Sequence, residues 1–262
     1  MAKSSLACRG LTKTYNTEEG ALTAIKDVNL EIPEETFSSV IGPSGCGTST
    51  LLKMLGGILK PTEGIIHIGK DDFEGGIPSK ALLEVGFVFQ SPNLLHWRTI
   101  RGNLELPLEM FGLSKKKYRD RLDRLLDMVG LLDYAKSYPD ELSGGMQQRI
   151  AMIRGLVHDP DILLMDEPLG ALDAITRELL RTKILDLLWD KNRKTVLMST
   201  KDINEALFLS SKIFALSSSP GTVVLEEDFS FSYSERGPSL HSKDRYLNLA
   251  STLRKFLVEE SR

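Results

Sequence analysis

Short apolar runs bounded by turn residues divide the first 90 residues of the chain into predicted β-strands. One of these runs, Phe37–Ile41, leads directly into a glycine-rich stretch, and the apolar spacing from Leu51 to Leu55 is that of a helix. This part of the chain therefore predicts a strand, a glycine-rich turn and a helix in direct succession. The predicted strands cover residues 6–8, 28–32, 37–41, 65–68 and 85–89.

From about residue 91 to residue 157 apolar residues recur every three or four positions, which predicts a block of helices. Two runs that follow, Ile162–Met165 and Thr195–Met198, predict buried strands. Alternating strands and helices favour an α/β fold with a parallel sheet. We expect one domain over residues 1–230, with the helical block at 91–157 inserted, and a tail at 231–262 that packs on the core. The predicted helices cover 104–111, 115–129, 147–156, 176–189 and 204–209, and an amphipathic segment covers 246–256.

The composition is that of an ordinary globular protein, with 41% hydrophobic and 26% charged residues among 262. The 33 Lys and Arg against 36 Asp and Glu give a net charge of −3, which argues against nucleic acid as a partner. No apolar stretch reaches the roughly 18 residues of a membrane span, and the N-terminus has no apolar block of signal-peptide length. With only Cys8 and Cys46, the chain is expected in a reducing cytoplasm.

The glycine-rich stretch Gly42-x-x-x-x-Gly47-Thr48-Ser49 has the glycine spacing of a P-loop. In a P-loop, backbone N–H groups at a helix start surround the phosphates of a nucleotide. Thr48 replaces the lysine that would reach the β- and γ-phosphates, whereas Ser49 still offers a hydroxyl to Mg²⁺. Taken alone, the stretch is also compatible with an ordinary strand-to-helix turn. The residues predicted to surround the nucleotide are Gly42, Ser44, Gly45, Cys46, Gly47, Thr48, Ser49 and Thr50. Because Cys46 precedes a helix, we expect its thiol pKa to be lowered.

Two carboxylates, Asp166 and Glu167, end the apolar run that starts at Ile162. The carboxyl ends of parallel strands are where open α/β sheets bind ligands. In that position Asp166 would hold Mg²⁺ and Glu167 would polarise an attacking water. The alternative is a strand that simply ends in solvated acids.

The stretch Leu142-Ser-Gly-Gly-Met-Gln147 resembles the signature sequence of ATP-binding cassette (ABC) ATPases. The resemblance covers about residues 4–230 and implies a P-loop NTPase (RecA-like) core with a parallel sheet, an N-terminal antiparallel β subdomain and an inserted helical subdomain. It also implies that the signature residues Ser143, Gly144, Gly145 and Gln147 face the nucleotide held by a second ATPase subunit. Three further residues match family positions: Tyr15 for adenine stacking, Gln90 for Mg²⁺ or water and for sensing the transporter, and Asp173 for the D-loop.

Within the family, the stretches at 90–99, 169–177 and 204–209 resemble importer ATPases of the nitrate, sulfonate and taurine group. That resemblance implies ATP and Mg²⁺ as cofactors and an integral-membrane permease that binds the helical block. It also implies an extracytoplasmic solute-binding protein, and a peripheral location at the cytoplasmic face of the inner membrane. The transported solute, the permease and the dimer partner are not given by the sequence.

A second departure from the family pattern lies at Lys201, where the family has the switch histidine that contacts the γ-phosphate. Loss of one preorganised donor costs about 10²–10³ in rate, so Thr48 and Lys201 together predict a weak or inactive ATPase. Lys201 either supplies the cation missing at Thr48 or is a solvated charge in a decayed site. Three functions stay open at this point: an importer ATPase, a non-hydrolysing adapter in an asymmetric heterodimer, and a soluble ABC protein of translation or DNA repair. The acidic charge and the single cassette disfavour the third.

Overall fold

The computed structural model describes residues 5–18, 20–170, 172–185, 193–232 and 235–260. Its centre is a six-stranded sheet in the order β10-β9-β3-β8-β7-β6. The neighbours from β9 to β6 are parallel, and β10 is antiparallel to β9 at the edge. All residues of β3, β7 and β8 are buried, as expected for parallel strands covered on both faces. The strands are β3 (Phe37–Ile41), β6 (Val85–Val88), β7 (Ile162–Asp166), β8 (Thr195–Ser199), β9 (Lys212–Leu216) and β10 (Val223–Asp228).

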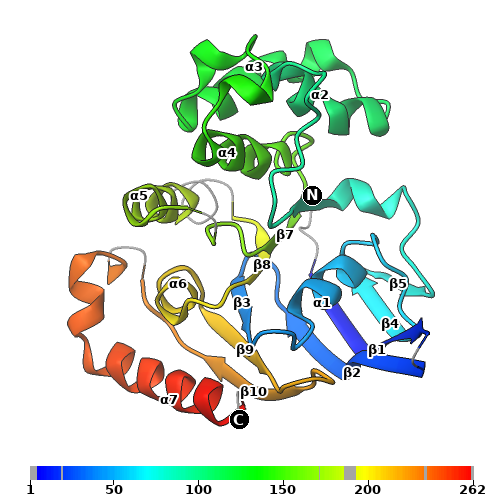
Figure 1. Cartoon of the computed structure of the whole chain (residues 1–262), viewed down its shortest axis with the longest axis vertical. Helices are drawn as coiled ribbons and strands as arrows, with labels where there is room; N and C mark the ends of the chain where they lie inside the picture. The colour runs from blue at the N-terminus through cyan, green and yellow to red at the C-terminus, as the bar shows by residue number, and fades with distance from the viewer. Residues whose placement is uncertain (1–4, 19, 171, 186–192, 233–234, 261–262) are drawn as a thin grey trace.

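A second, antiparallel sheet in the order β2-β1-β4-β5 lies beside the first (Figure 1). Helix α1 (Thr48–Leu55) packs between the two sheets. The apolar residues on its buried face belong to a single cluster that also contains residues of both sheets. Leu52 of α1 lies in this cluster with Ile66 of the antiparallel sheet and Leu164 of the central sheet. The strands of this sheet are β1 (Leu6–Thr17), β2 (Gly20–Ile32), β4 (Glu63–Ile68) and β5 (Asp71–Glu74).

The segment of about residues 91–157 contains the helices α2 (Ile100–Met110), α3 (Lys115–Met128) and α4 (Gly144–Arg154), which form a separate layer at one end of the molecule (Figure 1); this segment is here called the helical lobe. Thr99 begins α2 by accepting a hydrogen bond from the Gly102 N–H at 3.1 Å. The buried Asn103 amide donates to the Leu95 and Thr99 carbonyls, which fixes the loop before α2 on the helix. Short 3₁₀ helices, η1 (Ala81–Glu84), η2 (Leu132–Tyr134), η3 (Pro139–Glu141) and η6 (Pro238–Ser242), connect the elements.

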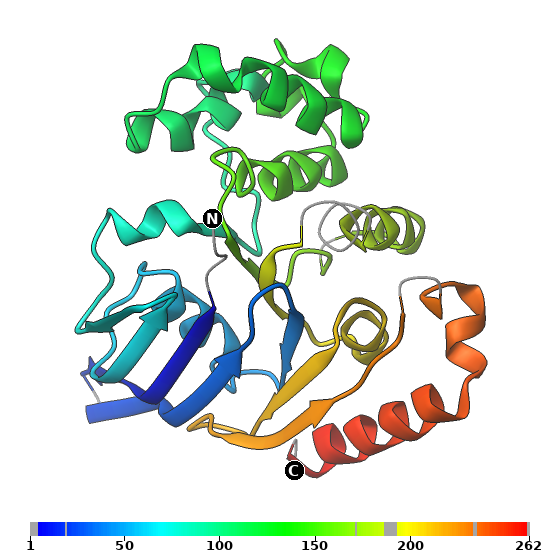
Figure 2. The same cartoon turned by 180° about the vertical axis from the view of Figure 1, so that it is seen from behind.

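Three helices complete the fold around the central sheet: α5 (Ala174–Leu185), α6 (Ile203–Leu209) and α7 (Asp244–Glu260). Figure 2 shows α7 running beside the strands β9 and β10 at the end of the molecule away from the helical lobe. The Tyr246 hydroxyl of α7 donates to the Asn204 side-chain oxygen of α6 at 2.8 Å. The C-terminal helix is therefore fixed to the segment that follows β8.

The predicted fold class is confirmed: a mostly parallel sheet, an antiparallel sheet near the N-terminus and an inserted set of helices are all present. The strands β5, β9 and β10 were not predicted from the sequence. The helix predicted at 176–189 ends at Leu185, and residues 186–192 lie outside the described residues. Within the described part of the chain, no helix is both long and apolar enough to span a membrane.

Candidate functional site

Four neighbouring parallel strands bring the candidate residues to one edge of the central sheet. The strands β3, β8, β7 and β6 lie in that order, and the residues after them include Gly42, Lys201, Glu167 and Gln90. Asp166 pairs in register with Ser199, so β7 and β8 end at the same level. The edge at which these strands end is therefore the candidate nucleotide site.

The P-loop backbone requires glycine at Gly47, which has a φ of 95°. A β-carbon at this position would lie 2.7 Å from Ile25 Cδ1 and 2.9 Å from the Ala24 carbonyl oxygen. Gly45 also has a positive φ, and no atom lies within 4 Å of where its β-carbon would be. The loop is thus closely packed at Gly47 and open at Gly45, which fits a backbone cradle for phosphates.

Cys46 is buried behind this loop, and burial raises the pKa of its thiol. The expectation of a lowered thiol pKa is therefore wrong, because desolvation outweighs the hydrogen bonds at the helix start. The thiol occupies the space beside Gly42, where a β-carbon would lie only 2.5 Å from Cys46 Sγ. The Cys46 side chain is thus a packing group of the loop, and only its backbone is available to a ligand.

The two predicted oxygen ligands of Mg²⁺ lie together at the end of β7. Ser49 Oγ donates to Asp166 Oδ1 at 2.9 Å, and the same carboxylate oxygen accepts from Ser199 Oγ at 2.8 Å. One carboxylate and one hydroxyl fit Mg²⁺, which is usually held by one or two carboxylates together with substrate phosphates. Among the described residues, no group of three or more His, Cys, Asp or Glu is placed to hold a metal ion by itself. Gln90, the third predicted ligand, is exposed beyond β6 and forms no hydrogen bond with a described residue.

Glu167 is held in an unusual backbone conformation next to Asp166. Its φ is 42°, a left-handed conformation that is uncommon for glutamate. Its N–H donates to Ser199 Oγ at 3.0 Å and to the Ser199 carbonyl at 3.1 Å, which fixes the turn. Strain of this kind is typical of functional sites. Ser199 was not predicted as a site residue, although a serine at the end of a buried strand was the available signal.

The Glu167 carboxylate forms an ion pair with Lys201, the residue predicted to stand at the position of the family's switch histidine. Lys201 Nζ lies 2.9 Å from Glu167 Oε1, and the two side chains are 55% and 15% exposed. The group predicted to polarise water is thus paired with the cation predicted at the position of the switch histidine. A pair this exposed contributes only about 0–1 kcal/mol, so a nearby phosphate can compete for the lysine.

Tyr15 of β1 lies near the start of α1. Its hydroxyl is 3.4 Å from Thr50 Oγ1, and Lys13 Nζ lies 5.2 Å from the ring centroid. The side chain predicted to stack on adenine is therefore close to the P-loop helix.

The signature residues lie in the helical lobe, apart from the P-loop (Figure 1). Ser143 begins α4 by accepting a hydrogen bond from the Met146 N–H at 3.3 Å, and Gly144 is exposed. The Gln147 amide donates to the Pro139 and Leu142 carbonyls at 2.9 and 3.2 Å, so this side chain holds the preceding loop.

In the D-loop, Asp173 accepts from the Thr176 N–H at 3.0 Å, while Ala171 lies outside the described residues. Asp173 thus stabilises the start of α5, as Ser143 does for α4.

The sequence pattern that defines the ABC transporter domain matches residues 25–170, which include the P-loop, Gln90, the signature and Asp166-Glu167. The chain belongs to the ABC transporter family. Among its relatives is the taurine import ATP-binding protein TauB of Jannaschia sp. (strain CCS1), which is 41% identical over 83% of this chain and 80% of its own length. The nitrate import ATP-binding protein NrtD of Synechocystis sp. (strain ATCC 27184 / PCC 6803 / Kazusa) is 39% identical over 82% of this chain and 79% of its own. The predicted resemblance to the nitrate, sulfonate and taurine group is confirmed.

The present chain is similar to a solved structure of a dimeric bacterial ABC transporter cassette, and the similarity covers the whole of the solved chain. The solved structure superimposes with a TM-score of 0.77 at 37% identity and covers 87% of this chain. The same cassette in a post-hydrolysis state bound to ADP and Pi has 36% identity and the same TM-score. The fold described above is therefore that of an ABC transporter cassette.

Proposed function

We propose that this chain is the ATP-binding, energy-coupling subunit of an ABC importer for a small anionic or organic solute of the nitrate, sulfonate or taurine type. The names of the relatives support the import role and the solute class. The proposal includes a second ATPase subunit, a permease, an extracytoplasmic solute-binding protein and a peripheral location at the cytoplasmic face of the inner membrane.

ATP would be held by the backbone of Gly45 to Ser49 and by the ring of Tyr15. The open backbone at Gly45 and the position of Tyr15 beside Thr50 support this assignment. Mg²⁺ would be held by Ser49 and Asp166, with Gln90 approaching from β6, and would offset the negative charge of the phosphates. The residues present fit such a group, except that Thr48 brings no cation.

The ion pair between Lys201 and Glu167 is the observation that supports impaired hydrolysis at this chain's own site. A carboxylate that accepts from an ammonium group is a weaker acceptor for the proton of an attacking water. At the same time the uncharged Thr48 leaves the β–γ phosphate oxygens without their usual cation. In the structure Lys201 is paired with Glu167, so any contact of this cation with a phosphate is shared with the carboxylate.

A second function is favoured by the complete signature sequence: a regulatory subunit in an asymmetric heterodimer. Ser143 caps α4, and the exposed Gly144 leaves the helix start accessible. In the family arrangement this helix end completes the site of the partner subunit. A chain with a substituted P-loop and an intact signature would weaken its own site and complete the other one.

The helical lobe, at about residues 91–157, is the proposed docking face for the permease. Trp97, just before α2, and Met110, the last residue of α2, are each 74% exposed. Large apolar side chains on a surface are typical of protein interfaces. Gln90 precedes this segment directly and would act as its hinge.

The nucleotide part of the proposal is tested by calorimetric titration of the purified chain with ATP and Mg²⁺. We expect saturable heat, and we expect Gly47→Ala to abolish it, because the added β-carbon cannot be accommodated beside Ile25. Gly112→Ala, at a positive-φ glycine in the helical lobe with open space around it, is the matched control. An unaltered chain that gives no heat at millimolar ATP contradicts ATP binding, whereas brisk steady-state phosphate release contradicts only impaired hydrolysis.

A further inference from the structure

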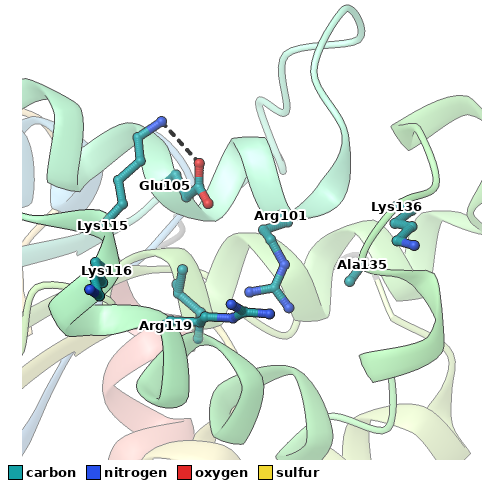
Figure 3. A pocket seen from close by; sticks show the side chains of 8 residues that line it. Arg101, Glu105, Lys115, Lys116, Arg119, Ala135 and Lys136 are labelled. Carbon is teal, nitrogen blue, oxygen red and sulfur yellow. Dashed lines mark ion pairs between the residues drawn. The ribbon is translucent and has the colours of Figure 1, made fainter.

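A pocket of about 450 Å³ in the helical lobe is lined mainly by cationic side chains. They come from α2, from the first two turns of α3 and from the segment after η2, so three parts of the chain meet there (Figure 3). Its charged lining residues are Arg101, Glu105, Lys115, Lys116, Arg119 and Lys136. Five cations thus surround the pocket with a single carboxylate among them.

Two of the five cations are neutralised by acids of the lobe. Lys115 lies 2.7 Å from Glu109 and 3.0 Å from Glu105, and these hydrogen bonds raise its pKa. Arg101 forms an ion pair with Asp123. The local acids are therefore already engaged with Lys115 and Arg101.

The other three cations, Lys116, Arg119 and Lys136, have no ion-pair partner among the described residues. Figure 3 shows the guanidinium groups of Arg101 and Arg119 pointing toward one another. Like charges so arranged repel, unless an anion lies between them. The pocket thus carries three positive charges that no acid among the described residues neutralises.

The position of the lysines adds to this positive potential. Lys115, Lys116 and Lys117 open α3, whose first turn contains no acidic residue. Helix starts favour acids, because the backbone dipole places partial positive charge there. The chain therefore has three cations at a helix end where they lower the stability of the helix.

We propose that this pocket binds a phosphate group of a small metabolite or of a lipid headgroup. Guanidinium groups bind phosphate oxygens through paired hydrogen bonds, and lysines add charge without demanding one geometry. The volume of the pocket admits a group of this size. The pocket is built from the helical lobe alone, so the proposal does not depend on the function assigned to the P-loop.

The test compares the full chain with two charge-reversal variants of α3. Lys116→Glu/Arg119→Glu removes two pocket cations, and Lys117→Glu/Arg124→Glu makes the same change in net charge with exposed residues of α3 that do not line the pocket. Each protein is titrated calorimetrically with pyrophosphate at 25 °C in one buffer. Binding at the P-loop is common to all three proteins and cancels in the comparison.

We expect the pocket variant to bind one pyrophosphate fewer per chain than the unaltered protein and the control variant. A second variant, Lys136→Gln, changes a residue outside the helices, so it tests the pocket even if the first variant fails to fold. It should weaken pyrophosphate binding at the pocket at least threefold. Equal binding by all folded proteins would overturn the proposal.

Vesicle sedimentation separates the two sources of the phosphate group. Vesicles of phosphatidylglycerol and phosphatidylcholine are compared with vesicles of phosphatidylcholine alone. If the source is a lipid headgroup, the unaltered and control proteins sediment with the anionic vesicles at least tenfold more than the pocket variant. If the source is a soluble phosphate, vesicle binding is the same for all three while the difference in pyrophosphate binding remains.

Discussion

At the scale of single residues, the resemblance predicts that the candidate site differs from its family in where one positive charge lies. Thr48 stands where a P-loop lysine is expected, and Lys201, just after β8, stands where a histidine is expected. In the structure that cation pairs with Glu167 at 2.9 Å. The resemblance predicted both substitutions as impairments, but the partner of Lys201 follows from the register of β7 and β8, which sequence does not reveal.

We expect Thr48→Lys to raise steady-state ATP hydrolysis more than Lys201→His does. A P-loop lysine offsets charge that builds on the phosphate oxygens as the bond breaks, and restoring one such contact is worth about 10²-fold in rate. Lys201→His frees Glu167 but adds no charge at the β–γ bridge, so we expect a gain of about tenfold or less. Phosphate release is measured with Glu167→Gln as the blank, and a larger gain from Lys201→His would contradict this ranking.

Lys201→Ala, made in the otherwise unaltered chain, shows whether Lys201 contacts the nucleotide phosphates or the Glu167 carboxylate during turnover. If Lys201 supplies the cation that Thr48 lacks, the remaining phosphate release falls to the level of Glu167→Gln. If Lys201 mainly occupies Glu167, the rate rises, because the carboxylate becomes available to water. An unchanged rate would show that the site has decayed and that the ion pair has no influence on it.

At the scale of elements, the sequence predicts best those strands that are buried on both faces. The prediction for β3 agrees with the structure, and those for β7 and β8 each miss one polar residue at the carboxyl end. The strand β10 was missed because it lies at the sheet edge, where its half-buried and exposed residues alternate through three acids. Strands β1 and β2 are longer than predicted, since their polar parts are held by pairing with each other.

The sequence predicted which site residues come together wherever the strands that carry them were predicted correctly. Ser49 and Asp166 meet at 2.9 Å because β3 and β7 flank β8 in the parallel sheet. The raised thiol pKa of Cys46 was not predictable, because burial depends on the packing of the whole P-loop. The use of the Gln147 amide in loop contacts likewise depends on the path of the chain before α4.

The helix α6 begins two residues after Lys201 and is held at its C-terminal end by a buried arginine. Arg236 donates to the carbonyls of Phe208, Ser210 and Phe231, and burial lowers its pKa to about 10. We expect Arg236→Ala to lower the free energy of unfolding by about 2–4 kcal/mol, because buried carbonyls lose their donors. Urea denaturation measures the loss, and the exposed Arg254→Ala, which should change stability by less than about 0.5 kcal/mol, is the control. Equal stability of the two variants would contradict this role of Arg236.

At the scale of the whole molecule, the structure separates the surface proposed for the permease from the C-terminal helix. The helical lobe and α7 lie at opposite ends of the molecule (Figure 1). Photo-cross-linkers placed at Trp97 and Met110 should therefore capture the permease, whereas one at Val258 of α7, which is 58% exposed, should not. Capture from Val258 and never from residues 91–115 would contradict the assignment of the helical lobe as the docking face.

The last prediction concerns mixed dimers. It rests on the separation of the signature from the P-loop within one chain (Figure 1), which leaves the signature to complete the site of a partner chain. We consider a repaired chain, Thr48→Lys/Lys201→His, paired with an unaltered chain and purified through two different tags. In the proposed dimer the repaired P-loop faces the unaltered chain's signature, so the mixed dimer should hydrolyse ATP at about half the rate of the repaired homodimer.

Ser143→Arg introduces a bulky cation at the start of α4, where Ser143 caps the helix. Placed in the unaltered chain, it should abolish phosphate release by the mixed dimer. Placed in the repaired chain, it reaches only the weak site, so the measured rate should barely change. This comparison keeps composition, charge and mutation constant and varies only the chain that carries Ser143→Arg. Equal losses in both arrangements would contradict the proposal that this chain completes its partner's site.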